Sequence, residues 1–179
     1  LLHMLITLLF VQIPVFLIDL DWPLEQHWQV YSVILFASIL GLVVLRGRAR
    51  KRQKLVLLIS VIGWALVFSS LAAGQYSIVY LLVLVSLFFM CFNYLEANFP
   101  ALVSSIAPAG KKGSAMGIYA SFQFFGAFIG GVLSGSVTEL LGSQWVFVLA
   151  SLLCMVWITI IKGISATDRL KRYTLNTNT

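Results

Sequence analysis

Apolar residues fill six long runs of the chain, and short polar segments separate these runs. An α-helix needs about 20 residues to cross the hydrocarbon core of a bilayer, and these runs are long enough to do so. None of them shows the alternation over about 10 residues that is typical of strands in a lipid-facing barrel. A helix satisfies its own backbone hydrogen bonds in lipid, so the pattern predicts an all-α polytopic membrane protein. The six predicted transmembrane helices are 1–18, 28–45, 55–73, 77–103, 114–141 and 145–161.

Composition gives the same fold class and sets the domain organisation. Of the 179 residues, 60% are hydrophobic and only 10% are charged, whereas soluble domains carry about 25% charged residues. We therefore predict one transmembrane bundle over 1–163 and a cytoplasmic polar tail over 164–179. The first run lacks the basic start and the cleavage site of a signal peptide, and Leu1 is not a methionine. We expect a piece of a longer protein, in preference to a complete short protein with a processed N-terminus.

Basic residues occur only in alternate connections. All 12 Lys and Arg residues lie in the second connection (46–54), in the fourth (111–112) and from Lys162 onward, and the other three connections contain none. By the positive-inside rule, the basic connections and the C-terminus are predicted to be cytoplasmic. The net charge of +6 thus lies beside span ends, where it sets orientation and attracts anionic lipid headgroups. We expect the lipid bilayer as a partner and no nucleic acid.

Catalytic and metal-binding patterns are not found in the sequence. Cys91 and Cys154 lie inside spans without a CxxC spacing, and His3 and His27 have no acidic or histidine partners at ligand spacing. There is no Ser-His-Asp pattern and no phosphate-binding GxxxxGK[ST] motif. We therefore predict a protein that is not an enzyme and that has no metal site and no cofactor.

Small residues recur along the fifth run. Gly126 and Gly130 form one GxxxG pair, and Gly131 and Gly135 form another. Small residues let two helices approach closely in lipid. The same glycines would also permit bending or sliding of a helix in a transporter. The sequence leaves static packing and movement as equal alternatives.

Polar side chains inside the apolar runs are the candidates for function. In the fourth run, Asn93 and Glu96 are three residues apart and share a helix face. Pro100 follows four residues after Glu96, and its ring leaves the Glu96 carbonyl without a helical partner. In the fifth run, Tyr119 and Gln123 are four residues apart and also share a face.

Glu96 is the most informative of these residues. An ionised carboxylate left unpaired in lipid costs about 2.5 kcal/mol or more, and no Lys or Arg lies inside a span to pair with it. Acids inside membranes usually serve function, so we favour a protonatable carboxyl that faces a cavity. The alternative is a side chain near the membrane boundary that extends toward cytoplasmic water, because Ser104 is only two helical turns away.

A family resemblance rests on three segments, "LLHMLITLLFVQIPV", "EQHWQVY" and "FNYLEANFPALVSSIAPAGKKGSAMGIYASFQFFGAFIGG". They resemble the C-terminal half of a major facilitator superfamily transporter, in particular the YajR-like branch of bacterial drug:proton antiporters. The resemblance implies helices seven to twelve of a twelve-helix fold in a bacterial inner membrane, with the missing N-terminal six-helix half as a partner. In that fold, helices seven, eight, ten and eleven line the cavity. The residues implied to face it are His3, Gln12, Asn93, Glu96, Tyr119 and Gln123.

The resemblance also implies an activity. It is secondary active transport, with proton-coupled export of a small amphipathic or drug-like substrate by alternating access. Glu96 would be the proton or cation site, and Asn93, Tyr119 and Gln123 would hydrogen-bond the substrate. Two alternatives stay open: a sugar or metabolite symporter or uniporter of the same superfamily, and a non-transporting membrane scaffold.

Overall fold

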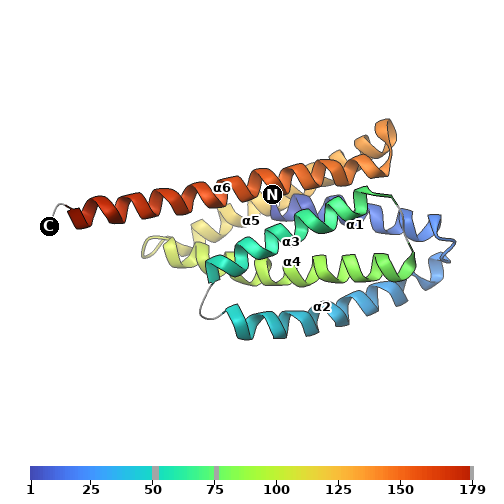
Figure 1. The fold of residues 1–179 in the computed structure, drawn as a ribbon, viewed down its shortest axis with the longest axis horizontal. Coiled ribbons are helices and arrows are strands. Elements are labelled where there is room, and N and C mark those ends of the chain that lie inside the picture. Colours follow the sequence, from blue (N-terminus) through green and yellow to red (C-terminus); the bar gives the residue numbers. More distant parts are fainter. Residues whose placement is uncertain (50–52, 75–76, 178–179) are drawn as a thin grey trace.

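The computed structural model describes the backbone of residues 1–49, 53–74 and 77–177, and the side chains of residues 1–43, 55–74 and 77–163. Six long α-helices, joined by short connections, make up this part of the chain (Figure 1). A single turn of 3-10 helix, η1 (Leu24–Gln26), leads into the second of them. The helices are α1 (Leu2–Asp19), α2 (His27–Ala49), α3 (Gln53–Ala72), α4 (Ile78–Ile106), α5 (Lys112–Leu141) and α6 (Ser143–Thr177).

All six helices are long and apolar enough to cross a membrane, and the described residues contain no strand. The predicted all-α polytopic fold is therefore confirmed. The helices exceed the predicted spans at several ends, most clearly α6, whose backbone stays helical through most of the segment predicted as a polar tail. In Figure 1 this end of α6 extends beyond the other helices. Hydropathy marks where a chain can enter lipid, and it does not mark where a helix ends.

Three close helix pairs organise the bundle. α1 packs against α5, α3 against α6, and α2 against α4. The contacts of α4 with α3 and α5, and of α5 with α6, join these pairs into one body. The largest fully buried side chains come from α1, α3, α4 and α6: Leu5, Leu8, Leu9, Ile13, Leu17, Trp64, Phe68, Leu71, Leu81, Phe88, Leu95 and Phe147.

Aromatic rings fill the centre of the bundle. The ring of Trp64 on α3 is stacked on that of Phe88 on α4, with centroids 4.4 Å apart and planes 10° apart. The buried indole N–H of Trp64 also donates a hydrogen bond to the Phe88 carbonyl oxygen at 3.0 Å. Phe68 and Phe147 extend the stack toward α6. Packing of this kind fixes α4 against α3, so the opposite face of α4 is held in a defined position.

Glycine brings α1 and α5 together. A Cβ atom added at Gly130 would collide with the backbone of Met4: it would lie 3.0 Å from the Met4 Cα atom and closer still to the Met4 carbonyl oxygen. A Cβ atom added at Gly126 would lie 3.5 Å from the Met4 backbone nitrogen, whereas one at Gly135 would have nothing within 4 Å. The first GxxxG pair is therefore a site of helix packing. The second pair does not need glycine for packing in the same way, because a Cβ atom added at Gly131 would make only an ordinary contact with Thr7 Cγ2 at 3.7 Å.

Candidate functional site

A hydrogen-bonded cluster forms where α4, α5 and α1 meet. The Glu96 carboxylate on α4 accepts hydrogen bonds from Gln123 Nε2 on α5, at 3.1 Å to Oε1 and 3.4 Å to Oε2. The same Nε2 donates to the Tyr119 hydroxyl oxygen at 3.0 Å, one helical turn earlier on α5. An amide nitrogen carries two hydrogens, so one can serve the carboxylate while the other serves Tyr119. The helical spacing that placed Tyr119 and Gln123 on one face thus aims both at Glu96.

α1 contributes His3 to the cluster. Its Nε2 lies 3.8 Å from Glu96 Oε2, which is ion-pair range but too long for a direct hydrogen bond. Its Nδ1 is buried without a hydrogen-bond partner, and its ring meets the edge of Phe92 at a centroid distance of 6.1 Å. The His3 and Glu96 side chains are 23% and 35% exposed. The cluster of His3, Glu96, Tyr119 and Gln123, here named the carboxylate cluster, is therefore shielded on one side and open on the other.

The length of α4 constrains the depth of the carboxylate cluster. α4 has 29 residues, which corresponds to about 43 Å at about 1.5 Å per residue. Glu96 lies four residues beyond the middle of α4, or about 6 Å along the axis. A hydrocarbon core extends about 15 Å to either side of its centre, so a helix centred in the bilayer carries Glu96 well inside it. The hydrogen bond from Gln123 also directs the Glu96 carboxylate toward α5.

Asn93 lies apart from the carboxylate cluster. Its Nδ2 donates to the Ser38 hydroxyl oxygen on α2 at 3.2 Å. Asn93 is about one turn before Glu96 on α4, but its side chain points toward α2, whereas that of Glu96 points toward α5. Ser38 is buried, and its own hydroxyl donates to the Leu35 carbonyl oxygen at 2.8 Å. No sequence pattern marks Ser38 as a partner of Asn93, because a serine that bonds its own helix is common in membrane spans.

Gln12 lies in the α1–α5 interface, and not beside Glu96. Only 1% of its surface is exposed, and its Nε2 donates to Ser134 Oγ at 2.8 Å and to Thr138 Oγ1 at 2.7 Å. Ser134 Oγ in turn donates to the Leu8 carbonyl oxygen at 3.2 Å. Gln12 Oε1 is buried without a partner. The family mapping placed Gln12 at the cavity, but in this conformation the tight approach of α1 to α5 encloses it.

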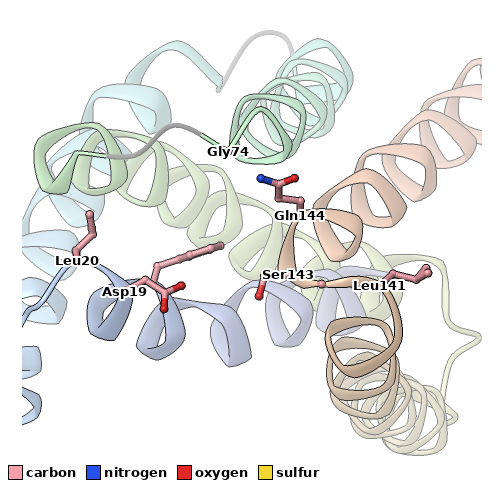
Figure 2. Close-up of a pocket in the computed structure, with 8 residues that line it drawn as sticks. Asp19, Leu20, Gly74, Leu141, Ser143 and Gln144 are labelled. Carbon is pink, nitrogen blue, oxygen red and sulfur yellow. The ribbon is translucent and has the colours of Figure 1, made fainter.

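A pocket lies away from the carboxylate cluster, at the end of the bundle where α1 ends and α6 begins. It has a volume of about 460 Å³. Figure 2 shows Asp19 and Leu20 of the α1 end together with Gly74 and Gln144 around it. His3 is at the opposite end of α1, so this pocket is remote from Glu96.

No group of three or more His, Cys, Asp or Glu residues that could hold a metal ion occurs within the described ranges. Glu96 and His3 are a pair, and their other neighbours are an amide and a phenol. The arrangement suits proton or cation binding: a carboxylate with a hydrogen-bond donor on one side and a titratable imidazole on the other. The amide donor holds the carboxylate in place, and its partial exposure gives access to water or ligand.

Comparison with known proteins assigns this architecture to a family. The family model described as Major Facilitator Superfamily matches residues 1–172. The chain is 37% identical over 163 residues to "Inner membrane transport protein YajR" of Escherichia coli (strain K12), which covers 89% of this chain and 36% of that protein. It is 28% identical over 131 residues to an uncharacterized transporter of Buchnera aphidicola subsp. Acyrthosiphon pisum, covering 72% of this chain and 34% of the relative. The chain thus spans about a third of the length of these relatives.

Proposed function

The chain belongs to the Major Facilitator Superfamily, and on that premise we propose that it is part of a secondary active transporter that exports small amphipathic or drug-like molecules in exchange for protons. The observation that carries the proposal is the carboxylate cluster, an acid on an apolar helix that is bonded across the bundle and open to one side. Titratable residues inside membrane helices commonly mark proton or substrate pathways. The E. coli relative is named as an inner membrane transport protein, and its similarity supports transport as the activity.

Each member of the carboxylate cluster has a part in the proposed cycle. Glu96 is the group that takes up and releases the coupling proton, and no other cofactor takes part. Gln123 holds the carboxylate in place through its hydrogen bond. His3 supplies a second titratable nitrogen within ion-pair range. The Tyr119 hydroxyl keeps its own hydrogen free to bond a substrate, because Gln123 donates to its oxygen.

Protonation would couple to movement through charge. A neutral Glu96 needs no partner in a closing, water-poor cavity, whereas an ionised one needs Gln123, His3 or a cationic substrate. Proton and cationic substrate therefore compete for one carboxylate, and this competition is the elementary form of exchange. Asn93 stays a proposed substrate contact on the α2 side, where its bond to Ser38 would have to yield to the substrate.

Membrane placement belongs to the same proposal. The protein is a multi-pass membrane protein, and we propose the bacterial inner membrane with a cytoplasmic C-terminus. Lys111 and Lys112, at the start of α5, support this orientation, because basic residues collect at cytoplasmic helix ends. The proposed partner is the remaining six-helix half, which would form the opposite wall of the cavity.

The decisive experiment uses the full-length protein in proteoliposomes under an imposed pH gradient. Glu96→Gln keeps the size and hydrogen-bonding capacity of the side chain but cannot exchange a proton. We expect gradient-driven flux to fall by at least about 100-fold, while exchange of substrate for substrate without a gradient persists. Glu139→Gln, which changes an exposed acid near the far end of α5, is the matched control and should retain wild-type flux.

Undiminished gradient-driven flux in Glu96→Gln would overturn the proton role of this residue. Flux in the wild type that ignores the pH gradient would favour a uniporter of the same superfamily. Flux that runs with the proton instead of against it would favour symport. Thermal unfolding of each variant in detergent shows whether a variant has lost binding and flux only because it no longer folds.

A further inference from the structure

The pocket at the end of the bundle lies where four membrane spans stop. α1 ends at Asp19, α3 at Ala72 and α5 at Leu141, and α6 begins at Ser143. All four helices are long and apolar enough to cross a bilayer. The apolar runs stop where the hydrocarbon core stops, so a pocket between their ends lies at the depth of the lipid headgroups. It is here named the interfacial pocket.

The lining of the interfacial pocket is part apolar and part polar. Apolar surface comes from Phe16, Leu20 and Leu141, and polar groups come from Asp19, Ser143 and Gln144. Figure 2 shows Asp19 at the end of α1 and Gln144 at the start of α6, with the pocket between these two helices. Its volume of about 460 Å³ is large enough for a small organic group. This mixture of surfaces suits the part of a lipid where the headgroup joins the acyl chains.

Gly74 fixes the position of the Gln144 side chain. A Cβ atom added at Gly74 would lie 3.1 Å from Gln144 Cδ and closer still to Gln144 Nε2. Gly74 also has a φ of +75°, a conformation that favours glycine. The amide of Gln144 therefore lies directly against the backbone of the connection after α3, and it closes the pocket on that side.

Asp19 gives the interfacial pocket an unbalanced negative charge. The connections at this end of the bundle (20–26, 73–77 and 142) contain no Lys or Arg. Within the part of the chain that the structure describes, no basic side chain lies in ion-pair range of Asp19. α1, α3 and α5 all end here, and the C-terminus of a helix carries partial negative charge. A ligand that fills the pocket must therefore bring a positive group to Asp19.

The start of α6 lines the same cavity with hydrogen-bond donors. The backbone N–H groups of Ser143 and Gln144 belong to the first turn of α6, where a helix provides no acceptors of its own. The Ser143 hydroxyl adds a donor, and the N-terminus of a helix attracts anions. One cavity thus joins an acid to a group of donors, which matches a ligand that carries an ammonium and a phosphate close together.

Apolar side chains beside the interfacial pocket face outward. Leu140 is 79% exposed, Leu141 61% and Trp145 53%. Tryptophan is enriched where a membrane meets water. Acyl chains can therefore lie along this surface of α5 and α6 while the attached headgroup enters the pocket. A water-soluble ligand of the same charge would make no use of this surface.

We propose that the interfacial pocket binds the headgroup of a lipid that carries a primary ammonium and a phosphate, as phosphatidylethanolamine does. The ammonium lies toward Asp19, and the phosphate lies toward Ser143 and the start of α6. The pocket is at the end of α5 away from Lys112, which is the outer leaflet in the proposed orientation. This site goes beyond the proposed transport activity and does not depend on it.

The test is the lipid preference of full-length protein in detergent, measured by native mass spectrometry. The probes are phosphatidylethanolamine, phosphatidylcholine and phosphatidylglycerol with identical acyl chains. We expect phosphatidylethanolamine to bind about fivefold or more tightly than the other two. A primary ammonium donates charge-assisted hydrogen bonds to a carboxylate, whereas the trimethylated nitrogen of phosphatidylcholine has no hydrogen to donate and phosphatidylglycerol has no cation.

Matched variants locate the preference in the interfacial pocket. Asp19→Asn should reduce phosphatidylethanolamine binding to the level of phosphatidylcholine and leave the other two lipids within about twofold. Asp21→Asn makes the same change two residues along the chain, outside the pocket, and should keep the preference. Ser143→Ala should weaken phosphatidylethanolamine and phosphatidylcholine alike by about two- to threefold, because both carry the phosphate. Thermal unfolding checks that each variant is folded.

Free O-phosphoethanolamine separates a lipid from a water-soluble ligand of the same chemistry. It should bind at least about tenfold more weakly than the lipid, because it lacks the acyl chains. Binding as tight as that of the lipid would identify a water-soluble zwitterion as the occupant and would overturn the lipid assignment.

The remaining outcomes are equally decisive. A wild-type protein that binds the three lipids equally overturns the headgroup site, and so does a preference that survives Asp19→Asn. A preference lost equally in Asp21→Asn overturns it as well, because the general negative charge of this end would then be the cause. An intact lipid preference together with flux that ignores the pH gradient would reject proton coupling and retain the headgroup site.

Discussion

Two glutamines attach α5 to its neighbours, and their surroundings differ. Gln12 is enclosed between α1 and α5, where its amide donates to two hydroxyl groups. Gln123 donates to a carboxylate and a phenol on a face that is open on one side. The amide of Gln12 and its hydroxyl partners do not change charge near neutral pH. An amide on a carboxylate beside an imidazole can respond to protons and to ligands. The acceptor and the access to solvent, and not the residue type, distinguish the two glutamines.

The largest effect is expected where α1 and α5 touch most closely. Gly130→Leu would force a side chain against the Met4 backbone, which cannot move aside as a flexible side chain can. We expect a loss of about 3 kcal/mol in the free energy of unfolding, measured by titration with denaturing detergent in mixed micelles. Gly135→Leu is the control, because its Cβ has open space, and it should be tolerated. Equal stability of the two variants would contradict the packing role of Gly130.

The two glutamines should then separate stability from activity. Gln12→Leu removes two buried hydrogen bonds and should lower the free energy of unfolding by about 1–2 kcal/mol, with the response of flux to the pH gradient retained. Gln123→Leu removes the donor to Glu96 on a partly exposed face. It should change stability by no more than about 0.5 kcal/mol and reduce gradient-driven flux several-fold. The comparison fails if Gln12→Leu abolishes the gradient response or if Gln123→Leu costs more stability than Gln12→Leu.

The smallest effect is expected at Asn93. Asn93→Ala removes one bond to Ser38, and hydrogen bonds between membrane helices are worth about 0.6 kcal/mol on average. Ser38→Ala removes the same bond from the other side and should cost a similar amount. If Asn93 only joins α2 to α4, the two variants will transport alike. A loss of flux in Asn93→Ala alone would identify a substrate contact.

Much of the fold follows from hydropathy, because the cost of unpaired backbone in lipid leaves few solutions for a run of apolar residues. The spacing of Tyr119 and Gln123 placed them together correctly, and the structure brings both to Glu96. His3 became a neighbour of Glu96 only in three dimensions, since the two are far apart in the chain and no sequence pattern links them. The family resemblance implied a cavity position for Gln12, and its bonds to Ser134 and Thr138 of α5 could not be predicted, because they depend on which helix packs against α1.

Trp64 contacts a second aromatic ring, that of Phe92, and this contact has a further consequence. Besides stacking on Phe88, its ring lies nearly parallel to that of Phe92, with centroids 6.3 Å apart and planes 8° apart. Phe92 also contacts the His3 ring. A rearrangement at Phe92 therefore changes the surroundings of an indole that is sealed from solvent. We expect the fluorescence of this indole to respond to such a rearrangement without an added label, in a variant whose other four tryptophans are replaced.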